Sequence, residues 1–195
     1  FPYTTLFRST LYGASGSLQE FQIAFDCAEL QKDGTIDIEQ SFKKISTNPS
    51  IKVIYFQRST GYEIRPAFTV GYLQKVMALV KEKFPDKIIM VDNCYGEFVN
   101  MDEPVAVGAD VMAGSLIKNP GGGIAPTGGY IAGKSGLIDR IAGSFSAPGI
   151  GTEIGSYAFG YQQYYQGFFM APHTVCQALM GVCLAARVFE KLGFQ

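Results

Sequence analysis

The stretch from Lys87 to Gly123 constrains the fold of this chain more than any other. It contains two short apolar runs, Ile88–Val91 and Val111–Ala113, each bounded by turn-forming residues and each followed by polar ones. Short continuous apolar runs of this kind are typical of strands that are buried in a parallel sheet. The sequence therefore predicts two parallel strands whose carboxyl ends carry polar side chains.

Three chemically useful side chains follow these predicted strands. Asp92 comes directly after the first run, and Ser115 and Lys118 come after the second, ahead of an Asn-Pro-Gly-Gly-Gly turn. Ligands of open α/β sheets bind just outside the carboxyl ends of the strands. Pyridoxal phosphate (PLP) requires a lysine for its aldehyde and an acid for its ring nitrogen. Its phosphate can be held by hydroxyl and glycine amide groups, so the set indicates a PLP site.

The same segments resemble a known family of PLP enzymes. They have the sequences DNCYGEF, GSLIKNPGGG, TGGYIAG and APGIGTEIG. They are similar to the cystathionine and methionine lyases of fold type I, the aspartate-aminotransferase-like fold. The similarity is greater still to the methionine gamma-lyase-like proteins of the aluminium-resistance family. It runs from about Leu18 to Phe194 and departs from the main cystathionine branch at Ile117, where a hydroxyl residue usually precedes the lysine.

The resemblance implies a fold, a cofactor and a reaction. The fold would be α/β, with a mostly parallel sheet sandwiched by helices, and this chain would be a fragment of the large PLP-binding domain. Lys118 would form the Schiff base, Asp92 would pair with the ring nitrogen, and Ser115 would bind the phosphate. The reaction would cleave a carbon–sulfur bond in a sulfur amino acid of the cystathionine or methionine type. The full-length protein would then assemble as a homodimer or homotetramer.

Each proposed site residue also has a plain structural interpretation. Most lysines are surface residues, an aspartate at a strand end can cap a turn, and a serine can simply fit a tight turn. Arg58 follows the apolar run Ile51–Phe56 at the same predicted edge. Its guanidinium would bind the phosphate or a substrate carboxylate, or else form a structural salt bridge. We assign catalysis to Lys118 and Asp92, and cofactor binding to these two together with Ser115 and Arg58.

A Schiff-base lysine must expose a nucleophilic amine. Burial and neighbouring positive charge achieve this by lowering the pKa of the lysine. On this interpretation we expect Lys118 to lie in an environment that lowers its pKa.

Two other functions remain open at the level of the sequence. One is a different PLP reaction on the same fold, such as transamination. The other is a non-catalytic α/β module whose glycine loop holds a phosphate. Gly121–Gly123 lacks the spacing of a P-loop and of a dinucleotide-binding fingerprint, so a nucleotide site is not predicted.

Composition limits the partners that we expect. The chain has 195 residues, of which 47% are hydrophobic, and a formal net charge of −1. This length supports a sizeable core, and the small charge provides no field for nucleic acid or a membrane surface. No apolar run reaches the ~18 residues of a membrane span. The four cysteines lack metal-ligand spacing, which predicts reduced thiols, no metal site and a cytoplasmic protein. The family resemblance, not the composition, implies a small amino acid as the substrate.

The rest of the chain alternates predicted strands and helices, which favours a sheet dominated by parallel strands. Asp37 and Gln40 have the spacing of a capping box, and the four residues Val70, Leu73, Met77 and Val80 form one apolar stripe. The further predicted elements are a strand at 21–25, a helix from Asp37 to Asn48, a strand at 51–56, a helix opened by Pro66 and closed by Pro85, a strand at 128–133, a helix at 137–142 and a helix begun by Pro172.

The chain is expected to contain only part of a domain, preceded by a segment that does not belong to it. Phe1–Ser9 has the sequence FPYTTLFRS, which resembles the translation of a sequencing-library adapter, and we exclude it from fold reasoning. Residues 10–195 are then predicted to be part of a PLP-binding large domain that ends at the start of the small domain. By the family resemblance, the aromatic residue that stacks on the cofactor and a glycine-rich phosphate turn would lie upstream.

Overall fold

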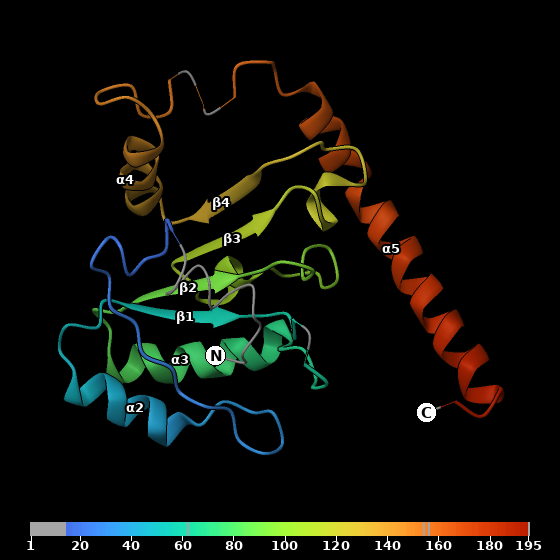
Figure 1. The fold of residues 1–195 in the computed structure, drawn as a ribbon, viewed down its shortest axis with the longest axis horizontal. Helices are drawn as coiled ribbons and strands as arrows, with labels where there is room; N and C mark the ends of the chain where they lie inside the picture. Colours follow the sequence, from blue (N-terminus) through green and yellow to red (C-terminus); the bar gives the residue numbers. More distant parts are fainter. Residues whose placement is uncertain (1–14, 62, 154, 156, 195) are drawn as a thin grey trace.

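The fold is a four-stranded, mostly parallel sheet with helices around it (Figure 1). The computed structural model describes residues 15–61, 63–153, 155 and 157–194, so the segment Phe1–Ser9 lies outside the described residues. The strands, in their spatial order, are β1 (Val53–Gln57), β2 (Ile88–Asp92), β3 (Val111–Ser115) and β4 (Gly129–Gly133). The first three are parallel, and β4 is antiparallel to β3. The predicted α/β class is confirmed.

The helices lie in the connections between strands and after the sheet. In chain order they are α2 (Ile38–Thr47), α3 (Val70–Lys83), the 3-10 helix η1 (Pro104–Val107), the 3-10 helix η2 (Asn119–Gly121), α4 (Ser135–Phe145) and α5 (Gln162–Lys191). The connection from β1 to β2 contains α3, as a parallel crossover requires. The connections from β2 to β3 and from β3 to β4 each contain a single 3-10 helix, η1 and η2, yet β3 runs parallel to β2 whereas β4 runs antiparallel to β3.

The hydrophobic core lies between α3 and one face of the sheet. The predicted apolar stripe of α3 is confirmed, because its four residues are 0–5% exposed. They pack against Phe56 of β1 and against Ile89 and Val91 of β2. Because side chains alternate along a strand, Asp92 points to the opposite face from Val91. The strand that contributes most to the core therefore delivers its carboxylate away from the core.

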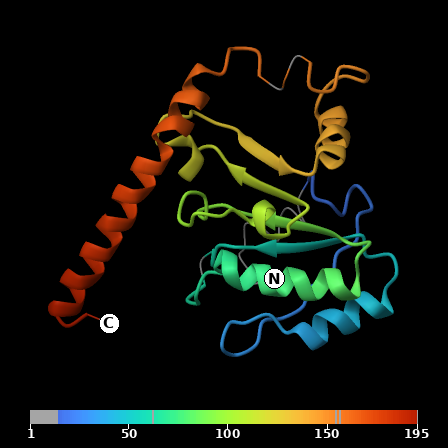
Figure 2. The same cartoon turned by 180° about the vertical axis from the view of Figure 1, so that it is seen from behind.

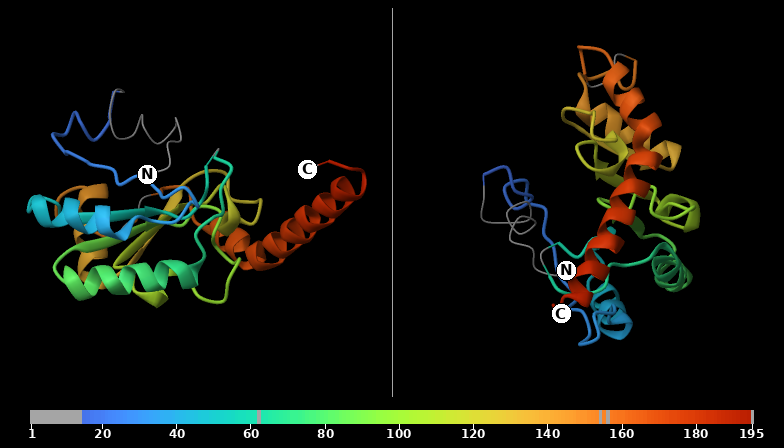
Figure 3. Two further views of the ribbon diagram at one scale, coloured as in Figure 1. Left: turned by 90° about the horizontal axis from the view of Figure 1, so that it is seen from below. Right: turned by 90° about the vertical axis from the view of Figure 1, so that its right-hand side faces the viewer.

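The opposite face of the sheet is more open. In the strand register, Gln57, Asp92, Ala113 and Ile131 form one row across the four strands. Asp92 and Ala113 are half-buried and Ile131 is 38% exposed. The described part of the chain ahead of α2, drawn in blue, passes on this side, opposite α3 (Figure 3). We call this the open face of the sheet.

The start of α2 has only part of the predicted capping box. Asp37 is the N-cap, and its carboxylate accepts a hydrogen bond of 2.8 Å from the backbone N–H of Gln40. The side chain of Gln40 does not return to the cap. Its Oε1 accepts instead from the backbone N–H of Glu29, at 3.0 Å. Only one half of the predicted capping box is present, because the loop before the helix competes for Gln40.

One predicted strand is wrong, and one predicted helix begins later than expected. Residues 21–25 form turns and coil, with Phe21 and Ile23 68% and 51% exposed. Alternation alone did not produce a strand there, and the backbone N–H groups of Phe21 and Ile23 donate to the carbonyl oxygen of Leu18 at 3.1 and 3.0 Å in local turns. Pro66 does not open α3, which begins at Val70. Thr69 is its cap, with the side-chain oxygen accepting from the backbone N–H of Tyr72 at 3.1 Å.

Helix α5 also differs from the prediction, since Pro172 lies inside it and the helix begins ten residues earlier. Its first part packs against η2, and Thr174, two residues after the proline, donates to the carbonyl oxygen of Gly122. Most apolar residues on its second part are not buried in this chain. Val175 is 5% exposed, whereas Leu179 and Val182 are 41% and 65% exposed. The helix leaves the sheet toward the C-terminus (Figure 2).

The length and composition of α5 are sufficient to cross a membrane, and it is the one such helix in the described ranges. The sequence prediction considered only continuous apolar runs and therefore did not identify this helix. A helix that packs its apolar residues inside a larger protein produces the same pattern.

Candidate active site

Asp92, Ser115 and Lys118 converge at the carboxyl edge of β2 and β3, as the sequence predicted. Asp92 pairs in register with Ala113, and Ser115 lies two residues further along β3 on the same open face. Lys118 follows on the turn that leads into η2, with Nζ 4.5 Å from the ring centroid of Tyr95. All three are half-buried, so they remain within reach of a ligand at this edge.

Two donors fix the carboxylate of Asp92. The backbone N–H of Cys94 donates to Oδ1 at 3.0 Å, and the hydroxyl of Tyr55 donates to Oδ2 at 3.1 Å. Burial first, and then Asp92 itself, raise the pKa of Tyr55, so the phenol stays protonated and donates. A carboxylate accepts about four hydrogen bonds, so Asp92 has capacity for a further donor from a ligand.

Sequence analysis missed Tyr55. It lies in β1, 37 residues before Asp92, and only the pairing of the two strands brings its hydroxyl to the carboxylate. The signal was present in the alternation of β1, which places Tyr55 on the face opposite Ile54 and Phe56.

The environment of Lys118 differs from the expected one. Burial lowers the pKa of the amine, but the Cys94 thiol, Tyr95 and Asp92 raise it, and the net pKa lies above its ordinary value. The neighbours of the amine in the described residues are acidic or polar groups rather than cations. The prediction of a lowered pKa is wrong for this chain without a bound cofactor, and the amine is held as an ammonium ion.

The glycines after Lys118 have a packing role. A Cβ on Gly121 would overlap the carbonyl oxygen of Leu116, and one on Gly122 would overlap that of Gly167 in α5. Gly122 also has φ 57°, in the left-handed region. The hydroxyl of Thr174 in α5 donates to the carbonyl oxygen of Gly122 at 3.4 Å. The close approach of α5 therefore fixes the turn that carries Lys118.

Arg58 lies apart from this group. Its side chain is on the core side of the sheet, where Nε donates to the carbonyl oxygen of Phe68 at 3.3 Å. Nη1 donates to Asn93 at 2.8 Å and Nη2 to Asn100 at 2.6 Å. Burial lowers the pKa of Arg58, and Glu103, whose carboxylate is 3.7 Å away, opposes this. Its assignment to cofactor binding stays a prediction, and the structure gives it a different role in holding the loop after β2.

That loop carries a buried polar network that the sequence analysis did not identify. Asn93 donates to Glu103 at 2.8 Å, and the hydroxyl of Tyr130 in β4 donates to Glu97 at 2.8 Å. Glu97 is 4% exposed, and burial raises its pKa. The network connects β4 to the segment that follows Asp92, so it holds the site from the core side. Its members are scattered over 38 positions, and no local pattern marks them.

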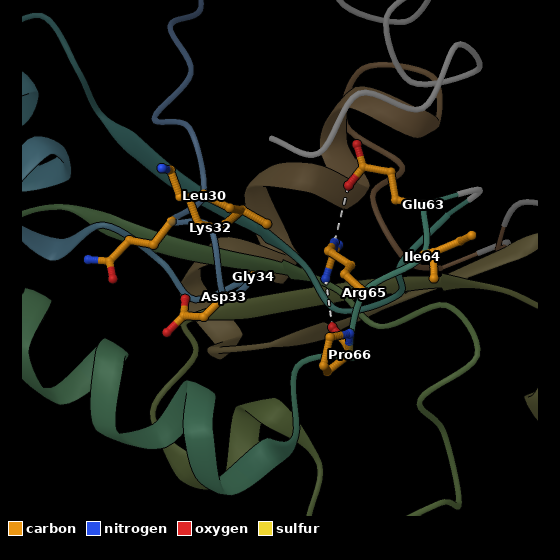
Figure 4. A pocket seen from close by; sticks show the side chains of 9 residues that line it. Leu30, Lys32, Asp33, Gly34, Glu63, Ile64, Arg65 and Pro66 are labelled. Atoms are coloured by element: carbon orange, nitrogen blue, oxygen red, sulfur yellow. Dashed lines mark hydrogen bonds and ion pairs between the residues drawn. The ribbon is translucent and has the colours of Figure 1, made fainter.

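The residues present fit the requirements of PLP. An acid with a fixed orientation, an amine and a hydroxyl share the open face at one sheet edge, which is the donor set that the cofactor needs. The separate hollow of about 330 Å³ in Figure 4, lined by residues 30–34 and 63–66, includes none of them. Arg65 in that hollow is paired with Glu63, with 3.4 Å between Nε and Oε2. Over the described ranges, no cluster of His, Cys, Asp and Glu is arranged to hold a metal ion.

The fold and this edge define the class of the protein. A mostly parallel sheet that carries an acid and a lysine at the carboxyl ends of adjacent strands is the large-domain arrangement of fold type I enzymes. The family model described as methionine gamma-lyase matches residues 2–195, and the chain belongs to this family.

Several relatives resemble the chain over nearly all of its length. The uncharacterized protein YnbB of Bacillus subtilis strain 168 is 51% identical over 180 residues, which cover 92% of this chain and 42% of YnbB. A Listeria monocytogenes structure, provisionally named a cystathionine beta-lyase involved in aluminium resistance, has a TM-score of 0.91 and 44% identity, covering 99% of this chain and 48% of that one. A carbon–sulfur lyase involved in aluminium resistance from Clostridium novyi has a TM-score of 0.89 and 42% identity, covering 100% and 47%. The chain thus spans about half the length of these relatives.

Proposed function

We propose that the intact protein carrying this chain is a PLP-dependent lyase that cleaves a carbon–sulfur bond in a sulfur amino acid of the cystathionine or methionine type. The observation that carries the proposal is the placement of the Lys118 amine and the Asp92 carboxylate together at the open face of β2 and β3. Family membership and the name of the Clostridium novyi relative support the reaction class.

The residues of this chain would act in distinct roles. When bound, PLP supplies an aldehyde that captures amines and a ring that accepts electrons from the substrate. Lys118 would hold the cofactor covalently and, when a substrate amine replaces it, would take the proton from the substrate α-carbon. Asp92 would keep the ring nitrogen protonated, with Tyr55 and the N–H of Cys94 maintaining its orientation. The hydroxyl of Ser115 would donate a hydrogen bond to the phosphate.

Covalent trapping tests the role of Lys118. The intact protein would be incubated with PLP, reduced with borohydride, digested and analysed by mass spectrometry. We expect the reduced cofactor on the peptide that contains Lys118, in the parent and in the control variant Lys43→Ala, whose substituted residue is exposed on α2. Lys118→Ala should lose this adduct. An unchanged amount of lysine-linked PLP in Lys118→Ala would contradict the assignment.

Product analysis separates the reaction from its alternatives. A lyase releases a thiol, ammonia and a 2-oxo acid from the sulfur amino acid. Transamination would instead convert the cofactor to pyridoxamine phosphate without release of a thiol. A phosphate-binding module without catalysis would yield neither product and no borohydride-fixed adduct.

We also propose the wider setting of the protein. A small amino acid is its partner, it acts in the cytoplasm, and it assembles as a homodimer or homotetramer. Exposed aromatic residues on α5 support assembly, with Phe168 and Phe169 55% and 82% exposed. Analytical ultracentrifugation of the intact protein tests the assembly, and a monomer at micromolar concentration would contradict it.

A further inference from the structure

Tyr95 lies in a turn with an unfavourable backbone conformation. Its φ is 67°, in the left-handed region that non-glycine residues seldom adopt, and Phe98 in the same turn has φ 61°. Tyr95 is also 61% exposed, so its ring contributes little to the core. Strained conformations of this kind persist only where the surrounding structure imposes them, and they cluster at functional sites.

Buried contacts on the core side impose the conformation. Arg58 donates to Asn93 at 2.8 Å and to Asn100 at 2.6 Å, so a single guanidinium ties the two ends of the turn together. Within the turn, the N–H of Gly96 donates to the carbonyl oxygen of Asn93 at 2.8 Å. A Cβ on Gly96 would overlap the guanidinium of Arg58. The backbone beside Tyr95 is therefore pressed against a buried cation and has little freedom.

The same turn is bonded to the turn that carries the lysine. Asn119, the residue after Lys118, donates from Nδ2 to the carbonyl oxygen of Glu97 at 3.0 Å. This bond sets the distance between the two turns. The ring of Tyr95 then lies over Lys118, with Nζ 4.5 Å from the ring centroid, which is cation–π geometry.

We propose that Tyr95 is a positioning residue for Lys118. Its ring, held over Nζ by the strained turn, fixes the position of the amine and favours the ammonium form. The other groups that act on this amine are the Cys94 thiol and the Asp92 carboxylate. The inference rests on the proposed function for the use that the protein makes of Lys118, but the contact itself belongs to this chain and is testable without PLP.

Two variants separate the ring from the backbone strain. Tyr95→Asn removes the ring and replaces it with a residue that tolerates positive φ, so the fold should be retained or stabilised. Tyr95→Phe keeps both the ring and the strain and removes only the hydroxyl. A purely structural role for Tyr95 predicts a change in thermal stability without any change at Lys118.

The measurement is the reactivity of Lys118 in the intact protein without PLP. Each protein is treated with acetic anhydride at a series of pH values, and acetylation of the Lys118 peptide is quantified by mass spectrometry. The plateau rate at high pH reports access to the amine, and the midpoint of the curve reports its proton affinity. Keeping the two apart prevents a more accessible amine from being mistaken for a less basic one.

We expect proton affinity at Lys118 to fall about two- to five-fold in Tyr95→Asn, the change that an exposed cation–π contact produces. The pH midpoint should drop correspondingly, and Tyr95→Phe should match the parent. An unchanged midpoint in Tyr95→Asn, or an equal drop in Tyr95→Phe, would overturn the inference.

The result is independent of the proposed reaction. If Tyr95→Asn lowers the pH midpoint as expected but the protein does not trap PLP on Lys118, only the proposed function is contradicted. PLP trapping on Lys118 with no effect of Tyr95 on the midpoint would contradict this inference alone.

Discussion

The two faces of the sheet differ in what they contribute. On the face that packs against α3, Leu73, Ile89 and Val91 are each 0% exposed. On the open face, Asp92 and Ala113 are only half-buried. The two kinds of position alternate along the same strand, so β2 serves both faces at once.

This difference separates stability from chemistry. Side chains on the core face have no room to change, because close-packed interiors respond to every lost methylene. Asp92 and Ala113 on the open face are only half-buried, so substitutions there should affect a bound ligand more than the fold. Three of the four predictions that follow test this division and one concerns acid stability, and they are given in order of decreasing expected effect.

The largest effect is expected for Asp92→Asn. On the proposed function, an amide would not supply the negative charge that keeps the cofactor ring nitrogen protonated, so kcat should fall on the order of 10³-fold, about 4 kcal/mol in the barrier. The melting temperature should change little, because Asp92 lies on the open face. Steady-state kinetics and thermal melting of the intact protein check this. Comparable kcat values for variant and parent would refute the role of Asp92.

On the core face, Leu73→Ala should destabilise the protein by about 3 kcal/mol through lost burial and the cavity that it leaves. Leu79→Ala in the same helix is the control, since Leu79 is 44% exposed and should cost far less. Denaturant unfolding monitored by circular dichroism measures both. Equal losses for the two variants would show that α3 is not packed as described.

The third prediction concerns acid stability. Asp110 is buried, yet ion pairs of 2.6 Å to Lys134 and Lys81 and the N–H of Ile89 outweigh its burial and lower its pKa. A lowered folded pKa means that its contribution to stability is present above the ordinary value of 3.8 and is lost as pH falls through the folded value.

Asp110→Asn should therefore lower stability at neutral pH and flatten the loss of stability below the ordinary pKa of 3.8. Asp102→Asn changes an exposed residue and is the control, in which stability should fall with acid pH as it does in the parent. Denaturant unfolding at a series of pH values gives the slopes. If the free energy of unfolding falls equally steeply with acid pH in Asp110→Asn and in the parent, Asp110 does not contribute to acid stability in this way.

The smallest effects are expected for two matched tyrosines. Tyr55→Phe removes the hydroxyl that donates to Asp92, and kcat should fall several-fold, equivalent to about 1 kcal/mol for one hydrogen bond. Tyr72→Phe removes a hydroxyl that accepts from the N–H of Ile36 beside the core, and should cost about 1 kcal/mol of stability instead. If both variants changed the same quantity, the division between the faces would be incorrect.

Local patterns predicted most of the elements. The apolar stripe of α3, the Asp37 cap and the four strands of the sheet follow from side-chain spacing and turn residues, because these depend on residues near in the sequence. The predictions of a strand at 21–25 and of a helix that begins at Pro172 both failed. At 21–25, the backbone N–H groups of Phe21 and Ile23 donate to the carbonyl oxygen of Leu18, so local turns replace the expected strand. Pro172 lies inside α5, whose first part packs against η2.

The candidate site was predictable where it follows a strand end. Asp92, Ser115 and Lys118 were found because the carboxyl ends of parallel strands gather at one edge. Tyr55 and Tyr95 were not found, because their relation to Asp92 and Lys118 depends on strand pairing and on the conformation of one turn. Arg58 lies at the expected edge, but its side chain points to the other face.

The sequence by itself determined the order of the elements and the residues at the strand ends, because hydrophobic period and turn chemistry are local properties of the chain. Only the tertiary structure decided three other features. These are the direction of β4, the burial of Arg58 under the loop after β2, and the placement of the Tyr95 ring over Lys118. Each depends on hydrogen bonds and close contacts between segments far apart in the sequence, and such contacts form only when the chain is packed.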